Sequence, residues 1–301
     1  MVGALVTSTD SGLSVPDWPT TYGQNMFTFP ISKWVGGVKF EHGHRLFASL
    51  VGLITVVLTL GLFLWDARRW VKGLASFALL LVCVQGLLGG LTVRYQLPIA
   101  VSSAHGSVAQ VFFCLSVWLA WATSSKWEKS SKWALNKTAK GAFLLLALAY
   151  LQILIGAVMR HSYAGLAIPT FPMAYGHWVP PFWNEGIVLN FLHTRVGPFL
   201  ILVGSSLLAD RLIRSKDRSR PRLGWFLLGV LTFQIGLGLL TLWSGKLYWV
   251  ASLHLAGGAL FMGTLFSVVL WSGTTRLTIP ESALTPVLGA RNEWKPATLA
   301  P

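Results

Sequence analysis

The stretch FEHGHRLFASLVGLITVVLTLGLFLW, residues 40–65, joins a short ionisable segment to a long apolar run. No charged side chain occurs from Leu46 to Trp65. An apolar α-helix of about 20 residues spans about 30 Å, which is the thickness of the hydrocarbon core of a bilayer. The run therefore predicts a membrane-spanning helix, and the two histidines, the glutamate and the arginine at its start require an explanation.

The rest of the chain has the same apolar character. Of its 301 residues, 53% are hydrophobic and 11% are charged, whereas a soluble domain has about 25% charged residues. Backbone groups find no water inside a bilayer, so the apolar segments must form helices. The sequence predicts an all-α polytopic membrane protein. Seven windows are long enough to span, near 43–65, 73–94, 101–123, 141–160, 187–209, 223–244 and 250–272.

The net charge of +14 is distributed unevenly among the loops. Alternate loops and the C-terminal segment contain 17 of the 24 Lys and Arg residues, whereas the remaining loops, 10–40, 161–186 and 245–249, contain three. This asymmetry follows the positive-inside rule, so the basic loops are predicted to be cytoplasmic and the long loops to face outward. The charge reflects membrane topology and argues against a nucleic-acid-binding surface.

An internal repeat runs through the chain. At an offset of 149, residues 85–92 resemble 234–241, Ser103-Ala-His105 matches Ser252-Leu-His254, and Glu41-x-x-His44 matches Asn190-x-x-His193. At an offset of 153, residues 12–19 resemble 165–172. Four matches in one order predict two four-helix units related by a pseudo-twofold axis along the membrane normal. The expected units are 1–125 and 139–273, followed by a cytoplasmic tail at 274–301.

The repeat also predicts a helix at the N-terminus. The fifth helix begins near Gly141, so its counterpart should begin upstream of Met1, and only Val2–Thr7 of it lie in this chain. We therefore expect an eight-helix fold of two four-helix bundles, with most of helix 1 missing from this sequence.

Four of the seven histidines occupy corresponding positions in the two units, 61 residues apart in each. They lie near the outward ends of four helices and are His44, His105, His193 and His254. A single membrane histidine often bonds a neighbouring helix, but four at one depth suit two bis-imidazole haem sites. Zinc or copper could also bind imidazole, although two histidines without cysteine or a carboxylate cluster are a poor donor set for either. The histidines without a counterpart, interpreted as interfacial or loop residues, are His42, His161 and His177.

Glu41 lies one helical turn before His44 on the same face, and its counterpart in the second unit is Asn190. If one unit transfers electrons and the other does chemistry, this carboxylate marks the chemical unit. The alternative is a salt bridge from Glu41 to Arg45 that fixes the helix start. Arginines near the outer boundary are candidate contacts for haem propionates, with interfacial snorkelling as the alternative. They are Arg45, Arg94, Arg160 and Arg195.

The loop at residues 12–19, the Glu41-x-x-His44-Arg45 motif and the duplicated histidine layer together resemble the haem A synthases. This membrane family of bacteria and mitochondria converts haem O to haem A. The likeness covers residues 1–272. It implies an eight-helix fold of two halves, and oxidation of the C8 methyl of haem O to a formyl group by successive hydroxylations.

The resemblance also implies roles for individual residues. His193 and His254 correspond to the axial ligands of a bound haem b, which would relay electrons. His44 and His105 correspond to the histidines of the substrate haem. Glu41 corresponds to the catalytic carboxylate, which would take up a proton or orient water.

Two features depart from the family pattern. Some members carry cysteine pairs in their outward loops, whereas Cys83 and Cys114 of this chain lie inside apolar windows. Arg195 stands two residues after its histidine, whereas Arg45 follows its histidine directly. This difference argues against a simple repeated His-Arg clamp.

The resemblance implies haem O and the lipid bilayer as partners, with haem O synthase, cytochrome oxidase assembly factors and a second copy of the chain as further candidates, and no nucleic acid. It places the protein in the plasma membrane of a bacterium, with the haem sites toward the outer face. Two other functions fit the same pattern: a quinol-linked di-haem b-type electron-transfer protein, and a haem transporter or chaperone. The difference between Glu41 and Asn190 favours the enzyme.

Overall fold

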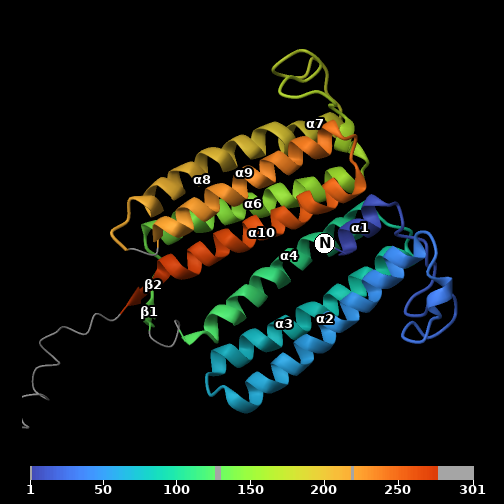
Figure 1. The fold of residues 1–301 in the computed structure, drawn as a ribbon, viewed down its shortest axis with the longest axis horizontal. Coiled ribbons are helices and arrows are strands. Elements are labelled where there is room, and N and C mark those ends of the chain that lie inside the picture. The colour runs from blue at the N-terminus through green and yellow to red at the C-terminus, as the bar shows by residue number, and fades with distance from the viewer. Residues whose placement is uncertain (1, 126–129, 218–219, 277–301) are drawn as a thin grey trace, which may run out of the picture.

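The computed structural model describes residues 2–125, 130–217 and 220–276, and long helices make up most of it (Figure 1). Seven helical segments within these ranges are long and apolar enough to cross a membrane. They are α2 (Val38–Trp65), α3 (Arg69–Arg94), α4 (Ile99–Ala122), α6 (Lys137–His161), the continuous stretch Glu185–Ile213, α9 (Arg220–Trp243) and α10 (Tyr248–Gly273). The prediction of an all-α polytopic membrane protein with seven spans in these windows is confirmed.

The stretch Glu185–Ile213 has three parts: α7 (Glu185–Phe191), the π-helical turn η3 (Leu192–Val196) and α8 (Gly197–Ile213). Asn184 caps its start, because its Oδ1 accepts a hydrogen bond from the amide of Ile187 at 2.9 Å. Asn136 caps α6 in the same way through the amide of Ala139.

A short helix, α1 (Val2–Ser8), precedes the first span. It packs against α2 and α10, just as its expected counterpart α6 packs against α8 and α4. α1 therefore occupies the position that the repeat predicts for the end of helix 1 (Figure 1).

The two sets of helices differ in how closely they pack. α6, α8, α9 and α10 enclose a large apolar core that includes Leu145, Leu227 and Leu265. In the first set, a smaller core of Ala75, Ala78, Leu115 and Leu119 joins α3 to α4. Most apolar side chains of α2 are exposed, as expected of a helix that faces lipid. The unit boundaries at 125 and 139 stay a prediction.

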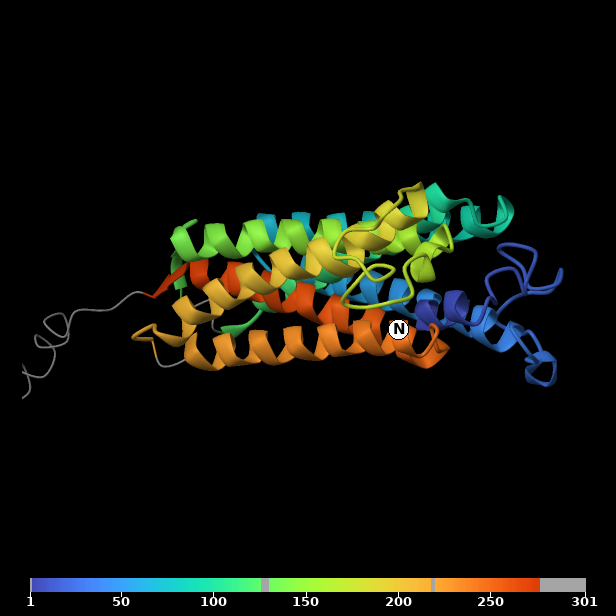
Figure 2. The ribbon, with the colours of Figure 1, turned by 90° about the horizontal axis from the view of Figure 1, so that it is seen from above.

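Two long loops, residues 9–37 and 162–184, lie at one end of the bundle (Figures 1 and 2). They contain two 3₁₀ turns, η1 (Ile31–Lys33) and η2 (Ala164–Leu166). At the other end, β1 (Ser130–Trp133) and β2 (Thr274–Arg276) form an antiparallel pair. The predicted tail 274–301 thus begins with a strand, because its backbone groups pair with the loop before α6, and residues 277–301 lie outside the described part of the chain.

Candidate functional site

The four symmetry-related histidines form two facing pairs near the end of the bundle that carries the long loops. The ring centroids of His44 on α2 and His105 on α4 are 6.4 Å apart, with an interplanar angle of 76°. Those of His193 in η3 and His254 on α10 are 6.3 Å apart, with an angle of 89°. The structure therefore brings together the two histidines predicted for each half.

The spacing of each pair fits a metal between the rings. An imidazole nitrogen binds a metal at about 2 Å, so two imidazoles on opposite sides of one iron have their centroids roughly 6 Å apart. Within residues 2–125, 130–217 and 220–276, no group of three or more His, Cys, Asp and Glu side chains could hold a metal ion. A two-histidine donor set suits an iron that brings its own four equatorial nitrogens, as haem does.

A glycine on a neighbouring helix lies against each of the four rings. A methyl group built on each glycine would approach Cε1 of its histidine closely. The distances are 3.0 Å for Gly3 and His44, 3.4 Å for Gly89 and His105, 2.4 Å for Gly156 and His193, and 3.1 Å for Gly238 and His254. The glycines follow the repeat, since Gly3 and Gly156 differ by 153 and Gly89 and Gly238 by 149. The backbone of a neighbouring helix thus lies directly against each imidazole ring.

Two glutamines attach histidine-bearing helices to their neighbours. Nδ1 of His193 lies 3.1 Å from the carbonyl oxygen of Gln152, and Nε2 of Gln152 donates to the carbonyl of His193 at 2.6 Å. A carbonyl only accepts, so Nδ1 carries the proton and Nε2 of the ring is left for a metal. Nε2 of Gln85 donates to the carbonyl of His105 at 2.9 Å.

The opening motif fastens the start of α2 to the loop at 9–37. Glu41 is buried; its Oε1 accepts from Arg45 at 2.7 Å and its Oε2 accepts from the amide of Val15 at 2.8 Å. Asn190 is also buried, but it donates from Nδ2 to the carbonyls of residues 164–165, both at 3.0 Å. The salt bridge considered as the alternative role of Glu41 is therefore present. At this position the first half accepts a hydrogen bond from its loop through Glu41, whereas the second half donates hydrogen bonds to its loop through Asn190.

Arg45 and Arg195 hold the loops from the same side. The guanidinium of Arg45 donates to three backbone carbonyls within residues 15–20, at 2.7 to 2.9 Å. Arg195 donates to the carbonyls of Thr170 and Met173 at 2.5 and 3.2 Å. These two carbonyls are the counterparts, at an offset of 153, of two that Arg45 binds. The two arginines therefore do the same work despite their different spacing from histidine.

The turn η3 explains that different spacing. Thr194 is the extra residue, and its hydroxyl donates to the carbonyl of Asn190 at 2.7 Å. Pro198 lacks the N–H that an α-helix would donate to the carbonyl of Thr194, which favours the wider turn. In a π turn the hydrogen bond joins residues five apart, so Arg195 lies on the face of Asn190 much as Arg45 lies on that of Glu41 four residues on.

The other two arginines differ from this pair. Arg94 is exposed, and its side chain makes no hydrogen bond within the described part of the chain. Arg160, at the end of α6, donates to the carbonyl of Ala4 at 2.9 Å and to the hydroxyl of Ser8 at 2.6 Å. A propionate contact by any of the four candidate arginines stays a prediction.

The three unpaired histidines are not members of the facing pairs, although His161 is close enough to His105 for their charges to repel. His42 is fully buried in the loop region, where Nδ1 lies 3.0 Å from Oγ1 of Thr21 and the ring packs on Phe29 and Trp34. His161 ends α6 half-buried, and His177 is exposed at a loop tip. Their interpretation as interfacial or loop residues stays a prediction.

The loop at 9–37 reaches over α3. Trp18 lies so close to Gly90 that a methyl group there would be 2.6 Å from the indole. Burial works to raise the pKa of Asp17, but hydrogen bonds from Thr20 and from the amides of Gly23 and Tyr22 outweigh it and hold that pKa below its usual range. This network fixes the turn that presents Trp18 to α3.

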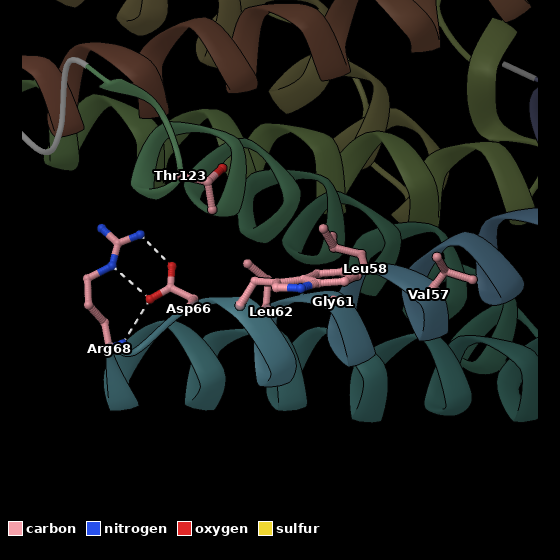
Figure 3. Close-up of a pocket in the computed structure, with 8 residues that line it drawn as sticks. Val57, Leu58, Gly61, Leu62, Asp66, Arg68 and Thr123 are labelled. Atoms are coloured by element: carbon pink, nitrogen blue, oxygen red, sulfur yellow. Dashed lines mark hydrogen bonds and ion pairs between the residues drawn. The ribbon is translucent and has the colours of Figure 1, made fainter.

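A cavity of about 430 Å³ lies at the opposite, basic end of the bundle, between the end of α2 and the end of α4 (Figure 3). Trp65 and other apolar side chains form one side of it, and Asp66, Arg68 and Thr123 line its polar end. Arg68 bonds Asp66 and donates to the carbonyl of Ala122 at 2.9 Å. The hydrogen bond that the Arg68 guanidinium donates to Asp66 is the main reason why the pKa of Asp66 falls from its usual 3.8 to about 2. The cavity lies at the opposite end of the bundle from both histidine pairs. The contacts of Arg68 beside it join the end of α2 to the end of α4.

A family model described as cytochrome oxidase assembly protein, COX15-CtaA, matches residues 1–266. The chain belongs to this family. Among curated relatives, proteins named heme A synthase from Shouchella clausii, Methylobacterium sp. strain 4-46 and Beijerinckia indica are similar to it. They are 29%, 30% and 27% identical, over 67%, 74% and 87% of this chain and 67%, 67% and 86% of their own lengths. The family match and these relatives confirm the resemblance to the haem A synthases that the sequence motifs indicated.

The four glycines that lie against the histidine rings, and Gln152, are functional candidates that sequence reasoning missed. Gly89 and Gly238 stood inside the repeated segments 85–92 and 234–241, where they served only to align the halves. Gly156 has Gly3 as its counterpart. The available signal was a glycine that recurs at one of the two repeat offsets, 153 for Gly3 and Gly156 and 149 for Gly89 and Gly238.

Proposed function

We propose that this COX15-CtaA member is a haem A synthase, which oxidises the C8 methyl of haem O to a formyl group. The observation that carries the proposal is a pair of bis-histidine sites that differ in one titratable group, one turn before the first histidine. There the first half has Glu41 and the second has Asn190. Relatives named heme A synthase support the same activity.

The second half is the cofactor site in this proposal. His193 and His254 would hold a haem b between their rings, and Gln152 would fix the His193 tautomer. When bound, haem b supplies one-electron transfer. The dense core of this half suits a resident group, because close packing holds both ligands in place.

The first half is the substrate site. His44 and His105 would position haem O, and Glu41 would accept a proton as the methyl is oxidised. With water as the source of the formyl oxygen, oxidation of the methyl (R–CH3 + H2O → R–CHO + 4 H+ + 4 e−) releases protons and electrons, so the site needs a base for the protons and an electron outlet, which haem b would provide. A proton on Glu41 would weaken its bonds to Arg45 and Val15, so proton uptake would loosen the loop above the site.

Haem O and the bilayer are the proposed partners, with haem O synthase, cytochrome oxidase assembly factors and a second copy of the chain as further candidates. The positive-inside pattern supports a position of the histidine pairs toward the outer face, and the proposed location is the plasma membrane of a bacterium. Haem b is the proposed resident cofactor.

The test is to purify the protein from cells that supply haem O, extract its haems and identify them by mass. Haem B together with haem O, its hydroxylated form or haem A supports the synthase. Haem B alone, at two per chain, would show an electron carrier instead.

Glu41→Gln tests the role of the carboxylate. The amide keeps the size and can still bond the loop, but it removes the base. We expect the variant to keep its haem b and to accumulate haem O or a hydroxylated intermediate. Glu185→Gln is the matched control, because Glu185 is an exposed acid at the same boundary. Haem A at the parental level from Glu41→Gln would end the catalytic assignment and leave only the loop contact.

A further inference from the structure

The first helix stands against the opposite half of the molecule. By the repeat, α1 belongs with α2, α3 and α4, yet it also packs against α10. Its counterpart α6 packs against α4. The first helix of each half therefore also packs against the last helix of the other half, α1 on α10 and α6 on α4.

Gly3 is the contact between α1 and the first histidine pair. A methyl group on Gly3 would be 3.0 Å from Cε1 and 3.2 Å from Nε2 of His44, so α1 lies directly on this ring. A sideways shift of α1 changes the room available to the imidazole. The position of α1 is thus part of the geometry of the His44–His105 pair.

Arg160, a residue of the second half, holds α1 in place. One guanidinium nitrogen donates to the carbonyl of Ala4 at 2.9 Å and to the hydroxyl of Ser8 at 2.6 Å. Ser252 of α10 reaches the same Ser8 hydroxyl at 3.2 Å. Asp10 is close enough to attract the charge of Arg160. Hydrogen bonds from a charged donor are among the stronger ones in proteins.

This link runs in one direction only. The counterpart of Arg160 in the first half is Thr7, which lacks the reach and the charge to hold α6 in return. Gly156 and Arg160 are one turn apart and share a face of α6. The same turn of α6 therefore touches the ring of His193 and holds the helix that touches the ring of His44.

We propose that Arg160 is a positioning residue for the first histidine pair, acting from the second half through α1. The proposal rests on the proposed haem-binding function. Without Arg160, the seven-residue α1 loses both charged contacts, and the ring of His44 loses its fixed support. His193 keeps Gly156 and Gln152 behind it. The charge of Arg160 also reaches His254, but its hydrogen bonds go to α1, so we expect the main effect on haem bound in the first half.

A disulfide tests the attachment of α1 without any haem. Ser8→Cys and Ser252→Cys are introduced together after Cys83→Ser and Cys114→Ser have removed the native thiols. The two hydroxyl oxygens are 3.2 Å apart, so the paired cysteines should cross-link on mild oxidation in membranes. Failure to cross-link would show that α1 does not lie against α10.

Arg160→Gln then tests the positioning role in the purified, haem-loaded protein. Extracted haem O and its products report the first half, and haem B reports the second. We expect the first to fall about tenfold per chain, as loss of a charge-assisted hydrogen bond predicts, with haem B unchanged. Lys246→Gln, which removes an exposed positive charge from the same end of the bundle, should change neither. The oxidised Ser8–Ser252 cross-link should restore first-half haem to Arg160→Gln.

The possible results separate clearly. A selective loss of haem B would mean that Arg160 serves the second half, and a loss of both without rescue by the cross-link would mean a general folding role. Either result overturns the proposal, as does Arg160→Gln loaded like its parent. A parent with no haem in its first half overturns the proposed function as well.

Discussion

Gly156→Ala should expel haem from the second site. The added methyl would lie 2.4 Å from Cε1 of His193, whereas ordinary contacts begin at 3.4 Å, so the ring must move by about 1 Å. The same shift strains the 3.1 Å contact between Nδ1 and Gln152. Overpacking of this kind costs about 1–3 kcal/mol, which corresponds to a fall in haem b occupancy of roughly tenfold or more.

The assay is the reduced-minus-oxidised spectrum of the purified variant, with haem B counted per chain. Gly141→Ala is the control on the same helix, because its methyl would meet no atom closer than 3.8 Å. Alanine at Gly238 would approach its histidine to 3.1 Å, so the loss there should be smaller than at Gly156. A Gly156→Ala protein with the haem content of Gly141→Ala would refute the view that these glycines hold the ligands.

Three further outcomes are expected. His254→Ala leaves one axial imidazole and should weaken or abolish the b-type spectrum of the second half, and an unchanged spectrum would contradict the ligand assignment. Gly90→Ala should push Trp18 off α3 and make the loop at 9–37 easier to cleave with protease, whereas Gly86→Ala on the same helix meets no atom within 4 Å and should not. Asp66→Asn should lower the melting temperature in detergent above about pH 4. The difference from the parent should close as the pH falls toward 2, because the folded-state pKa of Asp66 is below its usual value and its stabilisation is lost as the carboxylate protonates. A difference that persisted at pH 2 would show that the charge of Asp66 is not its cause.

The spans and the histidine layer were predictable because both depend on patterns along the chain. Apolar length decides where a helix crosses a membrane, and a repeat offset shared by His44 and His193 places them at one depth. The pairing with His105 and His254 then follows from helix order. The facing ring geometry of both pairs agrees with that prediction.

The contacts around these histidines were not predictable in the same way. Whether a glycine such as Gly156 touches a ring depends on the distance between two helices, which no local pattern encodes. The hydrogen bonds of Arg45 depend on where the loop turns its carbonyls, and tertiary contacts set that. Sequence reasoning therefore found charged residues at the correct boundary but assigned their partners only as alternatives, one of which, the Glu41–Arg45 ion pair, is present.

The π-helical turn at Leu192–Val196 has a consequence for how the two copies can diverge. One added residue normally rotates everything after it by about 100° around a helix axis, which would turn the lipid face of α8 toward the core. The wide turn absorbs Thr194 within a single turn, so the apolar face of the remaining helix keeps its direction. The descendants of a duplicated gene can thus acquire or lose single residues at this point without repacking the bundle. The sequence of one half can therefore change near its ligand site while the fold of both halves is kept.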